Sequence, residues 1–302
     1  MERIFTYTIP AEADGMDTAA FLLSRSYTRQ ILIGLKKDER GITVNGAHAG
    51  VRRILHTGDV LQTVFSEEAS PGVRPVSLPC RILYEDEDLL LADKPADMPV
   101  HPSVNNHDNT LANALAWHYQ QAGIPFTFRC ITRLDRDTTG LVLLAKNRLA
   151  ASILNRAHAT IQKTYLAICQ GRIPCAGVID APIARVQGSV IARCVDFARG
   201  DRALTRYSRL FYDPEKDLSL AHLIPDTGRT HQIRVHMRHI GHPLIGDFLY
   251  NPGNTALGRQ ALHCFGLDFV HPITRQKLHL SSPLPEDMRG CLAAVPAPFS
   301  GR

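Results

Sequence analysis

The densest group of polar side chains lies in the segment CITRLDRDTTGLVLLAKN, where Arg133, Asp135, Arg136 and Asp137 fall within five positions. An apolar run follows directly, and ordering this much charge beside a core strand is costly. The segment is therefore either a solvated loop with a polar turn residue, or a carboxylate held among cations at the mouth of a strand. The second arrangement is typical of a catalytic site, where neighbouring charges tune the chemistry of a carboxylate.

A second polar cluster occupies the segment IPDTGRTHQIRVHMRHIGHPLIGDFLY. Gly228 allows a tight turn of the backbone, and Arg229 and Arg234 follow it five positions apart. In an extended segment an odd spacing places two side chains on opposite faces, so we expect these two arginines to have different roles. An arginine that meets a buried carboxylate keeps it ionised and oriented.

The same segment holds four histidines, which raises the question of a metal site: His231, His236, His239 and His242. The pair His239-x-x-His242 is a weak ligand motif by itself. Gly241 and Pro243 interrupt any helix that would present the two rings on one face. We therefore predict no metal site here.

Tyr165 belongs to a third segment, Lys163-Thr164-Tyr165, which opens a predicted strand. A tyrosine in a strand is most often a packed sheet residue. The alternative is a ring that stacks on a nucleobase, an interaction worth roughly 1–3 kcal/mol and tolerant of base identity. The residue types alone leave both interpretations open.

Short strands with few helices must position these side chains. Strands are predicted over 89–92, 141–145, 163–169, 204–211 and 218–224, and helices over 110–121 and 147–161, the second capped by Asn147. Several neighbouring strands are too close in sequence to be joined by crossover helices. We therefore expect an α+β fold with a mixed or largely antiparallel sheet over residues 80–290.

A small separate unit is predicted over residues 15–66. Ser26 can cap a helix that runs to about Lys37, Asn45-Gly46 is a strong signal for a tight hairpin turn, and a strand follows over 60–65. Residues 67–79 have the proline-rich composition of a linker, and residues 291–302 form a C-terminal tail.

Composition places the chain among folded globular proteins. It has 302 residues, of which 44% are hydrophobic and 21% charged. We find no apolar run of the length of a membrane span and no secretory signal, so a cytoplasmic location is expected. The seven cysteines form no CxxC pair, which indicates free thiols in a reducing compartment and excludes a zinc ribbon or a disulfide scaffold.

The distribution of charge indicates a polyanionic partner. The formal net charge is only +5. Residues 21–60, however, carry seven Lys or Arg against three acidic residues, and residues 127–175 carry eight against two. Two separate basic regions are either ordinary solvated surface or the footprint of a nucleic acid, whose phosphates release counterions when a cation binds.

Five segments in order resemble the RluA type of RNA pseudouridine synthase. They are LADKPADMPVHP (91–102), RLDRDTTGLVLLAK (133–146), KTYLA (163–167), TGRTHQIRVHMRHIGHPLIGDFLY (227–250) and ALHCFGLDFVHPIT (261–274). The resemblance implies that the chain isomerises uridine to pseudouridine in RNA by breaking the glycosidic bond, rotating the base and joining its C5 to the sugar. Such a rearrangement needs no cofactor and no metal.

The resemblance also implies roles for individual residues. Asp135 matches the catalytic aspartate, Arg234 the arginine that pairs with it, and Tyr165 the tyrosine that stacks on the target base. Arg133 matches an arginine that occupies the gap left by the extruded base. Three further residues are expected to contact the RNA substrate or to support the site: Lys94, Arg136 and Arg229.

Three positions depart from the family pattern. Thr132 stands where the family has histidine, Asp97 where it has glycine, and Thr139 where it has serine. None of them replaces the aspartate, the tyrosine or the paired arginine. We therefore expect an active enzyme.

The segment SRSYTRQILIGLKKDERGITVNGAHAGVRRILHTGDVLQTVF resembles an S4 domain, a small RNA-binding module that often precedes this type of enzyme. The resemblance implies RNA contacts from six basic residues: Arg25, Arg29, Lys36, Lys37, Arg52 and Arg53. The expected partner is structured RNA, large-subunit ribosomal RNA first and transfer RNA as the alternative, bound by a monomer with no membrane association.

Two other functions are compatible with parts of the pattern. A non-catalytic RNA-binding or ribosome-assembly factor would keep both basic regions but would not need Asp135, Tyr165 and Arg234 together. A glycoside hydrolase would need two carboxylates across the scissile bond, with Asp137 as the second. Two residues so close in the sequence would sit side by side on a strand or stay unfixed in a loop.

Overall fold

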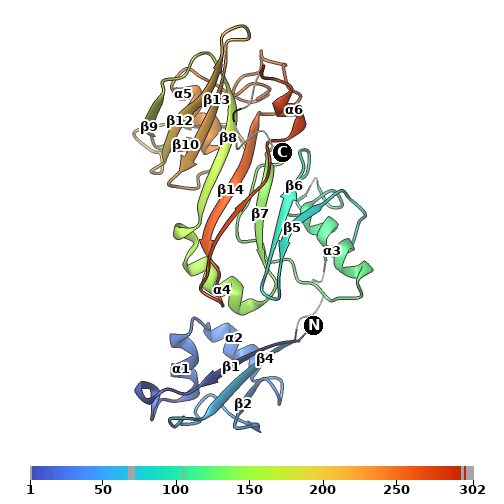
Figure 1. The fold of residues 1–302 in the computed structure, drawn as a ribbon, viewed down its shortest axis with the longest axis vertical. Coiled ribbons are helices and arrows are strands. Elements are labelled where there is room, and N and C mark those ends of the chain that lie inside the picture. The colour runs from blue at the N-terminus through green and yellow to red at the C-terminus, as the bar shows by residue number, and fades with distance from the viewer. Residues whose placement is uncertain (1, 67–71, 105, 294–295, 297–302) are drawn as a thin grey trace.

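The computed structural model describes residues 2–66, 72–104, 106–293 and 296. Figure 1 shows a small N-terminal unit in blue beside a larger unit built on one long sheet. Residues 67–71 of the predicted linker and most of the C-terminal tail lie outside the described ranges, and residues 73–80 form no helix or strand.

An antiparallel sheet in the order β1-β4-β2-β3 forms the N-terminal unit. Its strands are β1 (Glu2–Thr8), β2 (Ile42–Val44), β3 (Ala47–His48) and β4 (Val60–Ser66), and its helical elements are the 3₁₀ turn η1 (Ala11–Ala13), α1 (Thr18–Ser24) and α2 (Arg29–Leu35). The predicted hairpin turn is present, since Asn45 and Gly46 both have positive φ between β2 and β3.

Two expectations for this unit need correction. The helix cap is Thr28, whose hydroxyl accepts from the Ile31 amide, whereas Ser26 has φ +71° and cannot begin a helix. The unit also starts before residue 15, because β1 pairs with β4 along its whole length. That pairing is non-local, and the sequence alone does not reveal it.

The large sheet runs in the order β5-β6-β7-β14-β8-β13-β12-β9, with β15 paired to β14. Its strands are β5 (Arg81–Glu85), β6 (Leu89–Lys94), β7 (Thr139–Ala145), β8 (Gln162–Gln170), β9 (Ala176–Asp180), β12 (Leu204–Asp213), β13 (Leu218–Pro225), β14 (Leu262–Val270) and β15 (Lys277–Ser281). Among the described strands, β7 and β14 make the one parallel pair. The expected mixed, largely antiparallel α+β sheet is confirmed.

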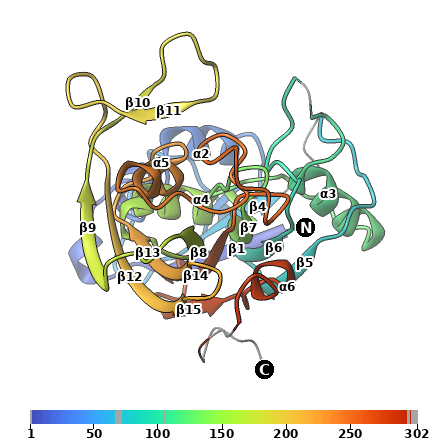
Figure 2. The ribbon, with the colours of Figure 1, turned by 90° about the horizontal axis from the view of Figure 1, so that it is seen from above.

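Helices cover both faces of this sheet, and a separate ribbon extends from it. The helical elements are α3 (Leu111–Gln121), α4 (Arg148–Arg156), the 3₁₀ turn η2 (His158–Thr160), α5 (Gln232–His239) and α6 (Glu286–Arg289); the ribbon is β10 (Ile183–Arg185) with β11 (Arg193–Val195). Figure 2 shows the ribbon projecting beside β9. The predicted cap Asn147 is present, and α4 ends at Arg156 rather than near residue 161. The helix predicted over 110–121 is α3, and Thr110 is its cap.

Alternation along the strands explains why the sequence shows continuous apolar runs. Leu89 and Leu91 face a core that includes α4 and α5, whereas Leu90 and Ala92 face the core under α3. The same rule places Tyr165 on the α4 and α5 side of β8, because its neighbour Leu166 faces α6. The functional candidates therefore share one face of the sheet.

The N-terminal unit packs against α4 of the larger unit. Leu149 and Ile153 of α4 belong to the hydrophobic core of that unit. Arg3 forms two hydrogen bonds of 2.9 Å to the buried carboxylate of Asp88, and Ser152 donates to the Ser26 carbonyl at 2.8 Å. The two units therefore share a packed interface, visible in Figure 1 between α2 and α4.

Gly140 permits the parallel pairing of β7 with β14. Its φ is +107°, and a Cβ there would lie 2.2 Å from the Cys264 carbonyl oxygen. Any side chain would force the two backbones apart. This pairing fixes the loop that precedes β7, which carries Asp135.

Gly140→Ala should therefore lower the free energy of unfolding by about 3 kcal/mol or more, from the sum of overpacking and backbone strain. Gly188→Ala is the matched control, because Gly188 has φ +78° with nothing within 4 Å of the added Cβ. The control should lose about 1–2 kcal/mol, the strain alone. Equal losses in denaturant titrations would contradict the close approach at Gly140.

His263 lies in the same parallel pair and is a buried titratable group. Its Nε2 donates to the Ser282 carbonyl at 3.1 Å, so Nδ1 accepts from the Thr139 hydroxyl at 2.9 Å. Serine and threonine both supply that hydroxyl, so this departure from the family pattern is conservative. Burial lowers the pKa of His263 to about 4.

A lowered histidine pKa makes the fold sensitive to acid. His263 binds a proton near pH 6.5 in the unfolded chain but only near pH 4 in the folded chain. The neutral ring therefore contributes its whole share of the free energy of unfolding above pH 7, and this share is lost as the pH falls from about 6.5 to 4. From pH 7 to pH 4 the loss from this group should be about 3 kcal/mol. His263→Gln should show a correspondingly flatter pH dependence of unfolding, and an unchanged one would contradict the assignment.

Candidate active site

Asp135 lies in the loop that leads into β7, and backbone hydrogen bonds shape this loop. The Thr138 amide donates to the Asp135 carbonyl at 3.1 Å, which closes a turn. Thr132 is buried, and its hydroxyl accepts from the Leu143 amide at 2.9 Å. Thr132 therefore has a structural role at the position where the family has histidine.

Lys94 stabilises the same loop by hydrogen bonds to its backbone. Its ammonium donates to the carbonyls of Pro95 and Arg136, both at 2.7 Å, and the residue is only 1% exposed. Burial lowers the pKa of Lys94 to about 7. Lys94 was expected either to contact RNA or to support the site. Its contacts with two carbonyls fit the second role, and its burial leaves no surface for an RNA contact. Asp97, just beyond, has φ +54°, the left-handed conformation that aspartate tolerates where the family has glycine.

Arg234 connects Asp135 to a second, fully buried carboxylate. Its Nη1 donates to Asp135 Oδ2 at 3.2 Å, while Nε and Nη2 donate to the two oxygens of Asp247 at 2.7 and 2.8 Å. Burial works against the charge of Arg234, but the two carboxylates outweigh it and raise the pKa of the guanidinium. Asp247 thus fixes the orientation of Arg234, and the Nη1 group of Arg234 points to Asp135.

Asp247 is a functional candidate that residue-by-residue reasoning did not assign. Its oxygen Oδ1 also accepts from the backbone amides of Leu249 and Tyr250, both at 3.1 Å. Gly246 precedes it with φ +69°, and a Cβ there would lie 2.1 Å from the Arg259 carbonyl oxygen. The Gly-Asp pair in the segment GHPLIGDFLY is the sequence signal for this buried carboxylate.

Residues 232–239 form the helix α5, so the expectation of an extended segment at Arg234 was wrong. Arg229 and Arg234 still point to different partners, but the reason is the loop-to-helix transition between them. Gln232 stabilises this transition, because its Oε1 accepts from Thr227 at 2.7 Å and from the Arg229 amide at 3.0 Å. Ile233 and Val235 are buried, which anchors α5 on the sheet.

His231 precedes α5 with φ +58° and faces Asp135. The Arg193 amide donates to the Tyr250 hydroxyl at 2.9 Å, and this hydroxyl lies 2.8 Å from His231 Nδ1. If Tyr250 donates its proton to Nδ1, the other ring nitrogen carries the hydrogen that points toward Asp135 Oδ2, 3.8 Å away. Burial lowers the pKa of His231, which favours this neutral form.

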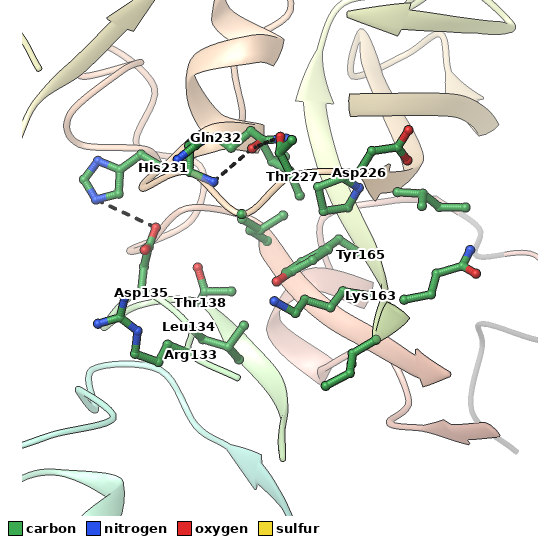
Figure 3. Close-up of a pocket in the computed structure, with 18 of the residues that line it drawn as sticks. Arg133, Leu134, Asp135, Thr138, Lys163, Tyr165, Asp226, Thr227, His231 and Gln232 are labelled. Atoms are coloured by element: carbon green, nitrogen blue, oxygen red, sulfur yellow. Dashed lines mark hydrogen bonds and ion pairs between the residues drawn. The ribbon is translucent and has the colours of Figure 1, made fainter. Parts of the chain in front are cut away.

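A pocket of about 810 Å³ opens beside these groups. Asp135, Thr138, Tyr165, His231 and Arg234 contribute to its lining. Figure 3 shows Asp135 and His231 on one side of the pocket, with Tyr165 and Lys163 of β8 on the other. The volume is in the range of small-molecule sites and is sufficient for one nucleotide.

Tyr165 and Lys163 reach the pocket from alternate positions of β8. Burial, followed by the nearby Cys264 and Asp135, raises the pKa of Tyr165 well above its ordinary value, so the hydroxyl keeps its proton at neutral pH. Burial also lowers the pKa of Lys163. The Tyr165 hydroxyl is therefore a neutral hydrogen-bonding group rather than a phenolate base.

The predicted substrate arginines differ in position. Arg133 and Arg229 line the pocket and are exposed. Arg229 is also held by the Arg202 carbonyl at 3.1 Å. Arg136 is outside the pocket lining, and its guanidinium pairs with Asp137 at 3.1 Å and with Asp97 at 3.6 Å. The structure thus brings two of the three arginines to the pocket.

The six basic residues predicted to contact RNA from the N-terminal unit are all exposed: Arg25, Arg29, Lys36, Lys37, Arg52 and Arg53. They lie away from the pocket lining and come from the ends of α1 and α2 and from the loop before β4.

The histidines of the second polar cluster have protein partners. His236 donates from Nε2 to the Ala181 carbonyl at 2.8 Å, and His242 Nδ1 lies 3.0 Å from the Gln170 carbonyl. Within the described ranges, one group has ligand atoms close enough for a metal: Asp86, Asp88 and His271. The side chains of this group already form hydrogen bonds with Arg3, Asn147, Tyr84 and the amides of Ile273 and Thr274.

Among the described helices, none combines the length and the apolar character that a membrane span requires.

Comparison with known proteins assigns the chain to a family. A sequence profile described as RNA pseudouridylate synthase matches residues 88–239, half of the chain. The ribosomal large subunit pseudouridine synthase D of Pseudomonas aeruginosa is 38% identical over 313 residues, which cover 95% of this chain and 94% of that protein. The chain belongs to the RluA family of RNA pseudouridine synthases.

Two further relatives agree with this assignment. The uncharacterized RNA pseudouridine synthase YjbO of Bacillus subtilis is 39% identical over 265 residues, or 86% of this chain and 93% of the relative. The solved structure of human RNA pseudouridylate synthase domain containing 1 superposes with a TM-score of 0.60 at 26% identity, over 72% of this chain and 89% of that one. This pseudouridine synthase thus shares both sequence and fold with the family.

Asp247 should be essential to the stability of the synthase. Asp247→Asn leaves Arg234 buried with its main partner gone, and we expect a loss of about 3–5 kcal/mol in the free energy of unfolding. Asp226→Asn removes the same charge from a partly exposed pair with Arg206 and should cost at most about 1 kcal/mol. Similar small losses for both variants in urea titrations would show that Asp247 does not support Arg234.

Proposed function

We propose that this enzyme isomerises uridines of large-subunit ribosomal RNA, with Asp135 as its catalytic carboxylate. The observation that carries the proposal is the contact of Asp135 with Arg234 at the edge of a pocket sized for one nucleotide. Asp135 is only partly exposed, at 29% of its side chain, and has one oxygen committed to the guanidinium. The carboxylate is therefore oriented before any substrate arrives.

The reaction requires a group that acts at the sugar of an extruded uridine. Extrusion of the base costs a few kcal/mol, which contacts with the rest of the RNA must offset. Asp135 can then attack C1′ as a nucleophile, or remove a sugar proton so that a glycal-like intermediate forms. Both routes break the bond between N1 and C1′, and both place the carboxylate beside the sugar.

The detached base must stay in the pocket while it rotates. Tyr165 lies across the pocket from Asp135, and we assign its ring to stacking on the base (Figure 3). Its protonated hydroxyl can hydrogen-bond to the base but cannot serve as an anionic base near neutral pH. Arg133, exposed at the rim, is assigned to the gap that the extruded base leaves in the RNA.

The choice of RNA rests on the relatives and on the N-terminal unit. The relatives from Pseudomonas aeruginosa and Nitrosomonas europaea, both aligned over most of this chain, are named ribosomal large subunit pseudouridine synthase D. The N-terminal unit presents six exposed basic residues around a helix and hairpin, as an S4-like RNA-binding domain would. Large structured RNA is a suitable partner for such a surface, and transfer RNA is the alternative.

Asp135→Asn should abolish pseudouridine formation and leave RNA binding within about twofold, because the amide keeps the shape but loses the charge. Purified enzyme is incubated with large-subunit ribosomal RNA made by transcription, and in parallel with transfer RNA. Chromatography of the released nucleosides measures the product, and filter binding measures affinity.

Asp137→Asn is the control for this test, since it removes the same charge two residues away and outside the pocket lining. It should retain activity. Turnover by Asp135→Asn would refute the catalytic assignment, and activity on transfer RNA alone would refute the proposed substrate. Loss of activity in both aspartate variants would instead favour a mechanism with two carboxylates.

A further inference from the structure

A groove of about 670 Å³ lies at the junction of the N-terminal unit and the catalytic unit. One wall comes from Thr28, Gln30 and Ile31 at the start of α2, and the other comes from α4 together with Arg129. This groove is separate from the active-site pocket, with which it shares no lining residue. We call it the junction groove.

One face of α4 supplies the catalytic wall of the junction groove. Arg148, Ser152, Asn155 and Arg156 line it, at spacings of four, seven and eight residues that place them on one side of a helix. Leu149 and Ile153 lie on another side and pack into the N-terminal core. Arg148, Asn155 and Arg156 are exposed. A hydrophobic contact thus fixes α4 while its polar face stays open.

The charge of the junction groove is strongly one-sided. Its lining includes three arginines and no acidic residue. Within the described ranges, neither Arg148 nor Arg156 forms an ion pair, whereas Arg136, Arg199, Arg206 and Arg259 all pair with carboxylates. The exposed guanidinium groups of Arg148 and Arg156 therefore fit an anionic ligand, and the guanidinium fork matches the oxygens of phosphate.

Residues that line the junction groove are close in the sequence to residues that line the active-site pocket. α4 is followed at once by η2, whose residues His158, Ala159 and Thr160 line the active-site pocket. Arg156 is therefore two residues from the pocket wall. Arg133 and Lys163 add two more basic side chains to the lining of that pocket. A molecule that reaches into the pocket at one point can lie in the junction groove at another.

We propose that the junction groove binds the phosphate backbone of the RNA whose uridine enters the pocket, at nucleotides away from the target. The inference rests on the proposed function, and it adds a second contact region that neither unit forms alone. The groove is preformed, because Arg3 with Asp88 and Ser152 with Ser26 hold the two units together. Phosphate contacts made here would offset part of the cost of extruding the uridine.

The double variant Arg148→Gln, Arg156→Gln tests this proposal with transcribed large-subunit ribosomal RNA as the probe. Loss of two phosphate contacts should reduce the slope of log affinity against log salt by about 2. The KM for that RNA should rise while kcat stays unchanged, since the pocket is intact. Arg148→Lys, Arg156→Lys keeps the charges and should restore most of the salt slope.

The matched control is Arg172→Gln, Lys216→Gln, which removes two exposed charges elsewhere. Arg172 follows the far end of β8, roughly 27 Å along that strand from η2, and Lys216 lies in the turn between β12 and β13. This control should leave affinity and salt slope as in the wild type. Equal behaviour of the two glutamine variants would overturn the proposal.

A photoreactive side chain at Asn155 gives a second, direct readout on the same RNA. Crosslinks from position 155 to nucleotides outside the modified site would support the junction groove, and none, from a protein that still binds the RNA, would overturn it. If the wild type forms no pseudouridine in this RNA, the proposed substrate fails. The binding and crosslinking results would still report on the groove.

Discussion

The shared guanidinium of Arg234 is the interaction on which the active site depends. A buried arginine is stable only if its donors are satisfied, and the fully buried Asp247 takes two of them. The Nη1 group of Arg234 donates to Asp135, which lies nearly one hundred positions earlier in the chain. The Asp135 carboxylate is therefore oriented by a guanidinium that is itself fixed by Asp247, and His231, bonded to Tyr250, lies on its other side.

The sheet brings these distant segments together and the two units then share one helix. β14 comes from the C-terminal part of the chain and inserts between β7 and β8, so the loop of Asp135 and the strand of Tyr165 flank a common strand. The helix α4 follows β7 and packs on the N-terminal unit with one side, on the sheet with another, and lines the junction groove with a third. The pocket and the junction groove are thus parts of one packed arrangement.

Much of the local structure could be predicted from the sequence because local physics determines it. The helix over 111–121, the Asn147 cap, the Asn45-Gly46 hairpin and the buried strands β6 and β7 follow from short-range patterns. The missed features depend on tertiary context. β1 is a strand through its pairing with β4, Lys94 is buried because two carbonyls meet its ammonium, and α5 is a helix despite Ile233 and Val235. The Gly246-Asp247 pair marks a tight turn, but it does not show that the carboxylate is buried, because that burial depends on Arg234.

The most direct test of this account is a structure of the Asp135→Asn variant bound to its RNA. It should show one uridine extruded into the pocket, with its C1′ beside the side chain at position 135 and its base against the Tyr165 ring. A complex in which every uridine stays stacked, or in which the extruded nucleotide lies away from Asp135 and Arg234, would contradict the central claim.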